Sequence, residues 1–194
     1  PPILDILGDE GATVTGVDWH SDYTHLRVVF PRTEGEIRKW DIVRTGIHFS
    51  NSEVGRRAVH ITWLLERLIC TNGMVASEIG GKTSIRHVGN PDRLRESVRL
   101  AITDARDNAQ HIRDQFKKAL DHAVNDPAHM LEQVAANGDM TKAQLDRMLA
   151  AFDVEPDQNL FGVVNAVTRA AQQEGTAENR YQMEKIGTRL LNAA

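Results

Sequence analysis

The feature of this sequence that most constrains its fold is a change of hydrophobic pattern near residue 90. Before that point, apolar and polar residues alternate in short segments, as is typical of β-strands. After it, apolar residues recur at steps of three and four, which places them along one side of an α-helix. Strands followed by helices predict an α+β fold with an antiparallel sheet. We expect a β-rich region over residues 1–90 and a helical region over residues 91–194, packed on it as one domain.

Several segments before residue 90 have the alternating pattern of a strand. These segments are residues 11–31, 40–50, the start of 56–70, and 82–88. Residues 20–23 are polar and interrupt the first segment, which predicts a β-hairpin, and Pro31 ends its second strand because proline cannot donate to a ladder. In the second segment one side is apolar and the other carries Arg44 and His48, which predicts a sheet with one face open to solvent.

The residues after 90 predict a long helix followed by shorter ones. Asn90, Pro91 and Asp92 combine an N-cap residue, a proline suited to the first helical position and an acid in the first turn. The apolar stripe that follows continues to about Val124. Further helices are expected to begin at Asp126 and Thr141 and to cover residues 158–173 and 176–191.

The chain is expected to work in the cytoplasm and away from membranes. No apolar run approaches the roughly 20 residues that a membrane helix needs, and no secretory signal begins the sequence. The single cysteine, Cys70, cannot form an intrachain disulfide and lies in an apolar stretch, which fits a reducing compartment.

The charge of the chain is unevenly distributed. The net charge is −4, but residues 42–118 carry 13 basic and 8 acidic side chains, whereas residues 1–41 and 119–194 are both acidic. This distribution permits a face that binds a polyanion, or a contact between the basic middle of one subunit and the acidic end of another. It also permits a basic face that is only solvated. We expect a homo-oligomer.

The basic middle of the chain contains the residues that we predict to bind nucleic acid. Arginine pairs bidentately with phosphate, and such contacts hold a DNA backbone without reading its sequence. The predicted contact residues are Arg44, Arg56, Arg57, Arg67, Lys82, Arg86 and Arg93. The prediction requires these side chains to converge on one continuous positive strip.

No motif assigns a catalytic, cofactor or metal site. Residues 80–83 read Gly-Gly-Lys-Thr, but they lack the earlier glycine of a phosphate-binding loop and lead into a strand. The eight histidines include no pair with the close spacing of a strong zinc site. We therefore predict no catalytic residue, metal or cofactor, and keep a metal-dependent enzyme that uses His48, His60 or His87 as a third hypothesis.

Three segments of the chain resemble a known family. Residues 51–55 read Asn-Ser-Glu-Val-Gly, residues 67–74 read Arg-Leu-Ile-Cys-Thr-Asn-Gly-Met, and residues 160–168 read Leu-Phe-Gly-Val-Val-Asn-Ala-Val-Thr. Together with the downstream His87, this pattern resembles the phage- and plasmid-like family known as domain of unknown function 932. The resemblance spans about residues 40–190 and implies an accessory protein of a phage or plasmid.

The motif residues have two interpretations, which the sequence leaves open. Asn51, Glu53, Asn72 and His87, together with Arg67, form either a buried polar network that holds turns or a site that contacts a ligand. The predicted architecture is also similar to that of phage single-strand annealing proteins, in which a curved antiparallel sheet and helices assemble into rings around a basic groove.

We therefore hypothesise a nucleic-acid-binding accessory protein of a phage or plasmid that binds or anneals single-stranded DNA during recombination or replication. The alternative is a non-enzymatic protein-interaction module that modulates a host protein. The basic middle and acidic ends of the chain fit both hypotheses.

Overall fold

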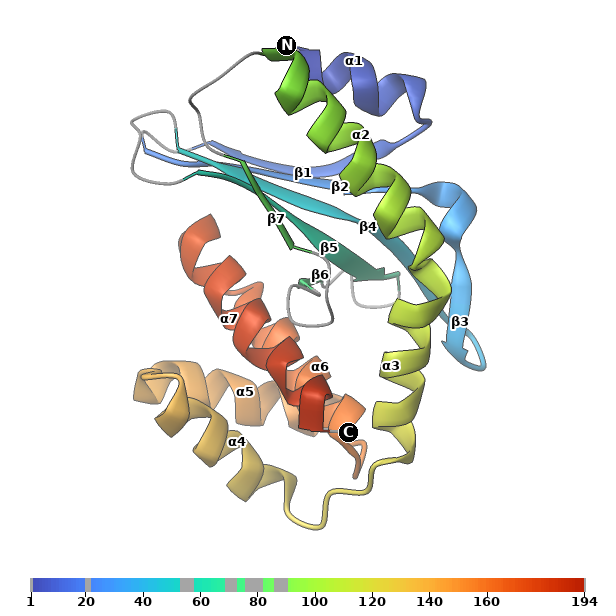
Figure 1. Ribbon diagram of the computed structural model, residues 1–194. Coiled ribbons are helices and arrows are strands. Elements are labelled where there is room, and N and C mark those ends of the chain that lie inside the picture. The colour runs from blue at the N-terminus through green and yellow to red at the C-terminus, as the bar shows by residue number, and fades with distance from the viewer. Residues whose placement is uncertain are drawn as a thin grey trace.

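The computed structural model of the protein describes residues 2–19, 22–52, 58–68, 73–75, 82–85 and 91–193. Over these residues it consists of an antiparallel sheet with helices on both faces (Figure 1). The predicted α+β class is therefore confirmed, with the sheet in the N-terminal half and the helices after it.

The sheet has the strand order β1-β2-β4-β5-β6, while β3 pairs with β4, and β7 pairs with β5. The strands are β1 (Thr13–Trp19), β2 (Thr24–Val29), β3 (Gly35–Arg38), β4 (Asp41–Asn51), β5 (Val59–Arg67), β6 (Gly73–Val75) and β7 (Lys82–Ile85). The predicted hairpin around residues 20–23 is confirmed, because β1 and β2 pair antiparallel on either side of it. The predicted strand over 82–88 is described only as far as Ile85.

Helices cover both faces of this sheet. They are α1 (Pro2–Asp9), α2 (Pro91–Asp107), α3 (Ala109–Asp121), α4 (Pro127–Asn137), α5 (Lys142–Val154), α6 (Leu160–Ala171) and α7 (Ala177–Arg189), with 3-10 turns at Pro31–Thr33 and Leu190–Ala193. The predicted helix starts at Asp126, Thr141 and Thr176 are confirmed, because each of these side chains accepts a hydrogen bond from the first turn of its helix.

Two helix predictions were wrong or incomplete. The long helix expected from residue 90 to about Val124 is divided into α2 and α3, with Asn108 between them outside the helical conformation. Asn108 directs its side-chain amide back to the carbonyl oxygen of Asp104, 2.8 Å away, a local bond that competes with regular helix. The short helix α1 was not expected at all.

The main core lies between the sheet and α2. Val28, Ile47 and Ile61 from three neighbouring strands pack in one buried cluster with Val98 and Ile102 of α2. A second cluster joins α4, α5, α6 and α7 to one another. In the described part of the chain, no helix is long and apolar enough to cross a membrane.

The expectation that one sheet face is open to solvent was wrong. His48, on the face away from α2, is only 1% exposed, and Thr62 beside it is equally buried. Helix α7 packs on this face, on the opposite side of the sheet from α2 (Figure 1). The covering helix comes from the far end of the chain, so the strand sequence alone gave no sign of it.

Candidate functional site

A layer of polar side chains lies between the sheet and α7. The register pairs His25 of β2 with Ser50 of β4, and Arg27 with His48, so that all four share one face. From α7, Tyr181 stacks on the His48 ring with centroids 4.4 Å apart and planes 23° apart. These side chains are buried: His25, His48 and Tyr181 are 3%, 1% and 3% exposed. The sequence therefore places ionisable groups where a sheet would ordinarily present apolar ones.

The two histidines of this layer contact each other directly. Nδ1 of His25 lies 3.2 Å from Nε2 of His48, and the rings are stacked at 5.2 Å. One of these nitrogens must donate and the other accept, because two N–H groups facing each other would repel. Which of the two nitrogens donates depends on the tautomer of each ring.

A buried ion pair lies beside the histidines. Nη2 of Arg27 donates to both carboxylate oxygens of Glu184, at 2.9 and 3.0 Å, and Nε2 of Gln172 donates to Oε1 at 2.8 Å. Glu184 is fully buried. Burial raises the pKa of the Glu184 carboxyl, and the attraction of Arg27 and the bond from Gln172 only partly oppose it.

A pocket of about 340 Å³ opens at the end of this layer, where β1, β2 and the start of α7 meet. Its lining includes the following aromatic, acidic and imidazole side chains: Asp18, Trp19, Asp22, Tyr23, His25 and Glu178. Nε2 of His25 lies 3.4 Å from Oε2 of Glu178, and Oδ2 of Asp18 lies 3.3 Å from Nη1 of Arg180. Among the described residues no lysine or arginine lines this pocket, so its chemistry suits hydrogen-bond donors or cations and not phosphate.

A second ionic cluster lies where β3, β4 and β5 meet the start of α6. Nε and Nη2 of Arg67 donate to the two oxygens of Asp41 at 2.7 and 2.6 Å, and Nη1 donates to Glu155 at 2.8 Å. Arg38 also contacts Asp41, at 3.2 Å, and pairs with Glu155. Burial lowers the pKa of Arg67, but hydrogen bonds and attraction from Glu155 and Asp41 outweigh it and raise the pKa overall. The hydrogen bond from Arg67 in turn lowers the pKa of Glu155.

This cluster joins two of the three motif segments. The Arg67 guanidinium lies 5.3 Å from the ring centroid of Phe161, and Nδ2 of Asn165 donates to Glu155 at 2.9 Å. Arg67 of one motif segment and Asn165 of another therefore share one polar cluster through Glu155, while the other members of the predicted motif network take no part in the contacts described here.

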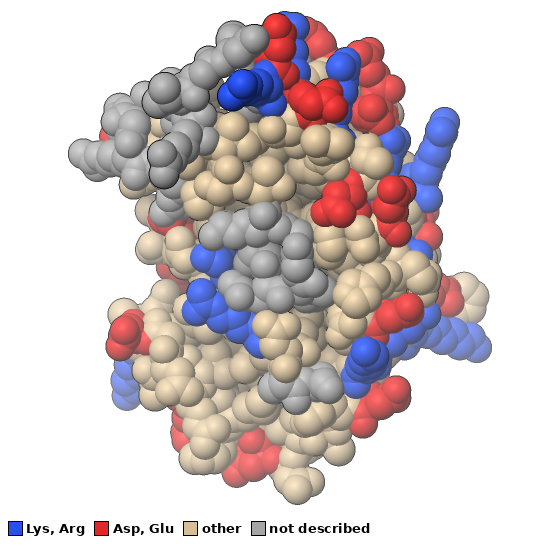
Figure 2. Space-filling model, viewed as in Figure 1, with Lys and Arg blue, Asp and Glu red and all other residues tan. Residues whose placement is uncertain are grey.

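The structure disperses the predicted DNA contacts that it describes. Arg67 is 1% exposed and bound by two carboxylates, so we withdraw it as a phosphate contact. Arg44 is half-buried, 3.5 Å from Glu66, whereas Arg93 is exposed on α2. In the view of Figure 2, the described lysines and arginines alternate with acids and form no continuous strip.

The remaining predicted residues give less information. Arg56, Arg57, Arg86, Glu53, Asn72 and His87 lie outside the described residues. Lys82 begins β7, with its side chain outside the description, and the half-buried Asn51 ends β4 opposite Thr24. Within the described ranges no group of three His, Cys, Asp or Glu side chains is placed to hold a metal ion.

Comparison with known proteins gives a family and no activity. The family model described as Domain of unknown function (DUF932) matches residues 10–193. No curated protein and no solved structure matches the chain. Because the family model covers nearly the whole sequence, the chain belongs to the DUF932 family.

Proposed function

We propose that the protein is a non-enzymatic protein-interaction module of a phage or plasmid, and that it binds its partner along strand β1. The observation that carries this proposal is the exposure of Val14, Val17 and Trp19, which are 41%, 60% and 72% exposed on this one short strand. The phage or plasmid origin rests on the motif resemblance, and a cytoplasmic location rests on the single cysteine, Cys70.

The three exposed side chains lie on the same face of the sheet. Val14 pairs with Val28, Val17 with Leu26, and Trp19 with Thr24, all in the antiparallel β1–β2 ladder. Residues 14 and 17 would fall on opposite faces of a regular strand, but the register shifts between Val14 and Gly16 and restores them to one face. Leu26 and Val28 belong to the core. The exposed row thus continues the apolar face of the sheet to its edge.

Strand β1 also offers backbone groups to a partner. It is the first strand in the order of the sheet, and in the described part of the chain it pairs with β2 alone. Beyond the register shift, residues 16–19 pair regularly with β2 and include no lysine or proline, and such an edge can act as a template for a further strand. Added strands gain affinity from main-chain hydrogen bonds and specificity from alternate side chains. This combination favours a protein partner over a polyanion.

The test is a partner capture that removes nucleic acid. Full-length protein is incubated with nuclease-treated host lysate as wild type, as Val17→Lys and as Val154→Lys. Val154 is the matched control, because it is 64% exposed but lies at the end of α5. We expect a partner to be retained by wild type and Val154→Lys and lost from Val17→Lys. Equal retention by both variants would count against β1 as the binding surface.

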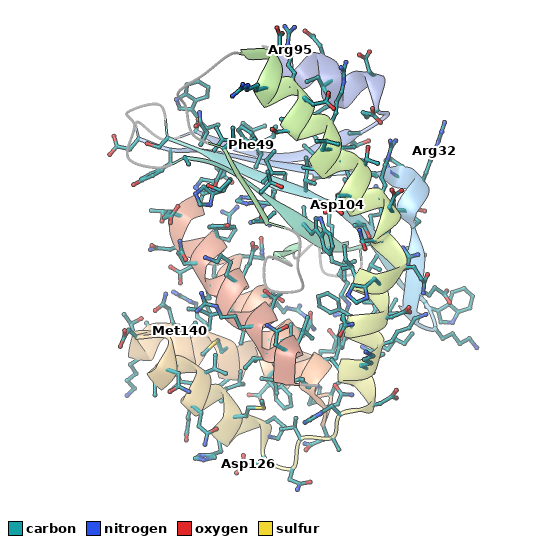
Figure 3. The ribbon with its side chains drawn as sticks, in the orientation of Figure 1. Arg32, Phe49, Arg95, Asp104, Asp126 and Met140 are labelled. Carbon is teal, nitrogen blue, oxygen red and sulfur yellow. The ribbon has the colours of Figure 1, made fainter. Side chains whose placement is uncertain are left out.

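Single-stranded DNA binding is the second candidate, and one observation favours it. Arg93, Arg95 and Arg99 are exposed along the first turns of α2, and Figure 3 shows Arg95 at the start of this helix. The architecture, with α2 running across an antiparallel sheet, supports the analogy with annealing proteins (Figure 1). The acids Asp92 and Glu96 alternate with these arginines, which weakens the local positive potential.

A fluorescence titration with a labelled oligo-dT at low and high salt tests this second candidate. The variants are Arg93→Ala/Arg95→Ala/Arg99→Ala and Arg56→Ala/Arg57→Ala. A triple variant of Lys117, Lys118 and Lys142 to alanine removes as many charges from α3 and α5 and serves as the control. DNA binding predicts a loss of affinity with salt and with the arginine variants only. An affinity that changes neither with salt nor in the arginine variants would contradict DNA binding.

A further inference from the structure

We propose that a second copy of this chain pairs with β1 in antiparallel orientation, so that Val17 faces Val17 of the other copy across a two-fold axis. This inference rests on the proposed function and names the ligand that β1 binds when no other protein is present. β1 is the first strand of the sheet (Figure 1), and in the described part of the chain it pairs with β2 alone. Its outer edge is therefore open to another strand.

The exposed apolar row of β1 is symmetric about Val17. The ladder with β2 pairs the three members of this row with evenly spaced residues: Val14 with Val28, Val17 with Leu26, and Trp19 with Thr24. The register shift before Gly16 thus places Val14 as far from Val17 as Trp19 is on the other side. An antiparallel copy centred on Val17 therefore brings Val14 of each copy opposite Trp19 of the other, and these apolar side chains all share one face.

Other registers match the two edges less well. A register centred on Asp18 would place two carboxylates directly opposite each other, and like charges in that position destabilise a sheet. A register centred on Gly16 would place Trp19 beyond the end of the other β1. Contacts in which one residue meets a second, while that second meets the first, are those of a two-fold dimer, the commonest symmetry of homo-oligomers. The pattern of β1 is therefore self-complementary.

The face of β1 that is turned toward α7 offers a hydrogen-bond donor to the second copy. In the same register Asp18 of one copy lies opposite Gly16 of the other, and Gly16 pairs with Arg27 of β2. The Arg27 side chain passes beside the glycine, since a Cβ at residue 16 would lie 3.5 Å from its Cδ. Nη2 of Arg27 binds Glu184, whereas its buried Nε has no hydrogen-bond partner among the described residues. The incoming Asp18 carboxylate supplies the acceptor that this N–H lacks.

Sedimentation equilibrium of the purified full-length protein tests the dimer. A contact of one strand from each copy is small among protein interfaces, so we expect a weak dimer that forms between about 1 and about 200 μM. Val17→Lys should raise its Kd at least about 100-fold, because the two-fold axis brings the two lysines together. Val154→Lys is the matched control and should keep the wild-type Kd, since Val154 is 64% exposed but lies at the end of α5.

Cysteine cross-linking tests the register. Val17→Cys should form a disulfide between copies under mild oxidation, because directly opposite residues have Cα atoms within disulfide range, about 4.4–6.8 Å. Val14→Cys and Trp19→Cys should each fail to cross-link alone, since either residue would lie roughly 13 Å from the same residue of the other copy. A mixture of these two variants should cross-link at least about tenfold more than either alone. The unchanged protein, which carries Cys70, controls for that thiol.

A further pair of variants tests the contact of Asp18 with Arg27. Asp18→Ala should raise the Kd of the dimer about tenfold. Arg180→Gln breaks the ion pair within one copy, in which Nη1 of Arg180 lies 3.3 Å from Oδ2 of Asp18, and it should leave the Kd unchanged. Equal increases in the two variants would overturn the contact with Arg27, because Asp18 would then act through Arg180.

The outcomes separate the dimer from the proposed function. Wild type that stays monomeric up to about 200 μM overturns the dimer, and the proposed function stands if this monomer still retains a lysate partner that Val17→Lys loses. A dimer with the same Kd in Val17→Lys and Val154→Lys overturns β1 as its interface. Val14→Cys that cross-links alone as readily as Val17→Cys overturns the register. A dimer that depends on Val17 but retains no lysate partner supports the inference and removes the host partner.

Discussion

Two arginine–glutamate pairs connect the sheet to the C-terminal helices, and the pKa of the glutamate is shifted in opposite directions in the two pairs. Arg67 meets the carboxylates of Asp41 and Glu155, and its hydrogen bond lowers the pKa of Glu155. Arg27 pairs with Glu184, the one carboxylate beside it in the described part of the chain, and burial raises the pKa of this carboxyl in spite of the pair. Glu155 keeps part of its surface, whereas Glu184 is fully buried. Desolvation therefore decides the protonation of one carboxyl and its partners decide that of the other.

The difference assigns distinct roles to the two clusters. The Arg67 cluster has its charges matched by several partners and fixes the start of α6 against the strands. The Arg27 pair shares its layer with the stacked histidines, close to the pocket lined by His25. We therefore expect variants of the first cluster to change stability, and we expect variants of the second cluster to change the layer beside the pocket as well.

The largest expected effect comes from removing the two arginines in turn. Arg67→Ala leaves Asp41 buried and keeps Arg38 as a cation that contacts both Asp41 and Glu155, and it should lower the free energy of unfolding by about 3–5 kcal/mol. Arg27→Ala should cost less, because Glu184 can take up a proton and become neutral. Urea denaturation at neutral pH measures both.

A surface pair calibrates this comparison. Arg95 lies 3.8 Å from Asp92 with 49% and 77% of the two side chains exposed, so its replacement by alanine should cost about 1 kcal/mol or less. If Arg67→Ala costs no more than Arg95→Ala, the Arg67 cluster is not the structural junction that its geometry suggests.

The pH dependence of stability should differ in sign between the two glutamates. The pKa of Glu155 is lowered by folding, so its contribution is present above its ordinary pKa and lost as pH falls through the folded value. The pKa of Glu184 is raised, so its contribution is present below its ordinary pKa and lost as pH rises through the folded value. Glu155→Gln should flatten the loss of stability in acid, and Glu184→Gln should flatten the decline at higher pH.

Urea midpoints at intervals from about pH 3 to pH 8 measure these slopes for wild type and both variants. Asp146→Asn on the exposed side of α5 is the control, and it should leave both slopes as they are. Identical changes of slope in the two glutamine variants would contradict the opposite assignments.

The fold class and several helix starts could be predicted because they depend on local patterns. Alternation over neighbouring residues specifies a strand, and a side chain such as Thr141 caps its helix through an amide three residues away. The same reasoning failed at Asn108, where α2 and α3 are separate helices although the apolar stripe continues. It missed α1 as well.

The candidate site could not be predicted because its parts come from opposite ends of the chain. His25 and His48 lie on a strand face that the pattern marks as polar, and Tyr181 from the far end of the chain packs on that face. Glu184 lies 157 residues beyond its partner Arg27. Of the residues predicted to bind DNA, Arg67 was assigned from residue type, and no local signal indicates that Asp41 and Glu155 surround it.

A difference in pH dependence distinguishes the two clusters through their amide donors. Asn165 donates to Glu155 at 2.9 Å and Gln172 donates to Glu184 at 2.8 Å, so Asn165→Ala and Gln172→Ala each remove one bond to a carboxylate, worth about 1.5–3 kcal/mol. In Gln172→Ala the loss of stability should be smaller in acid. Without this donor the pKa of Glu184 rises further, and a neutral carboxyl loses less free energy than a carboxylate when the donor is removed. In Asn165→Ala it should persist over the same pH range, because Arg67 still holds the pKa of Glu155 low. Urea titrations of both variants at about pH 5 and pH 8 measure this, and losses that vary together with pH would mean that the clusters do not differ as their pKa directions imply.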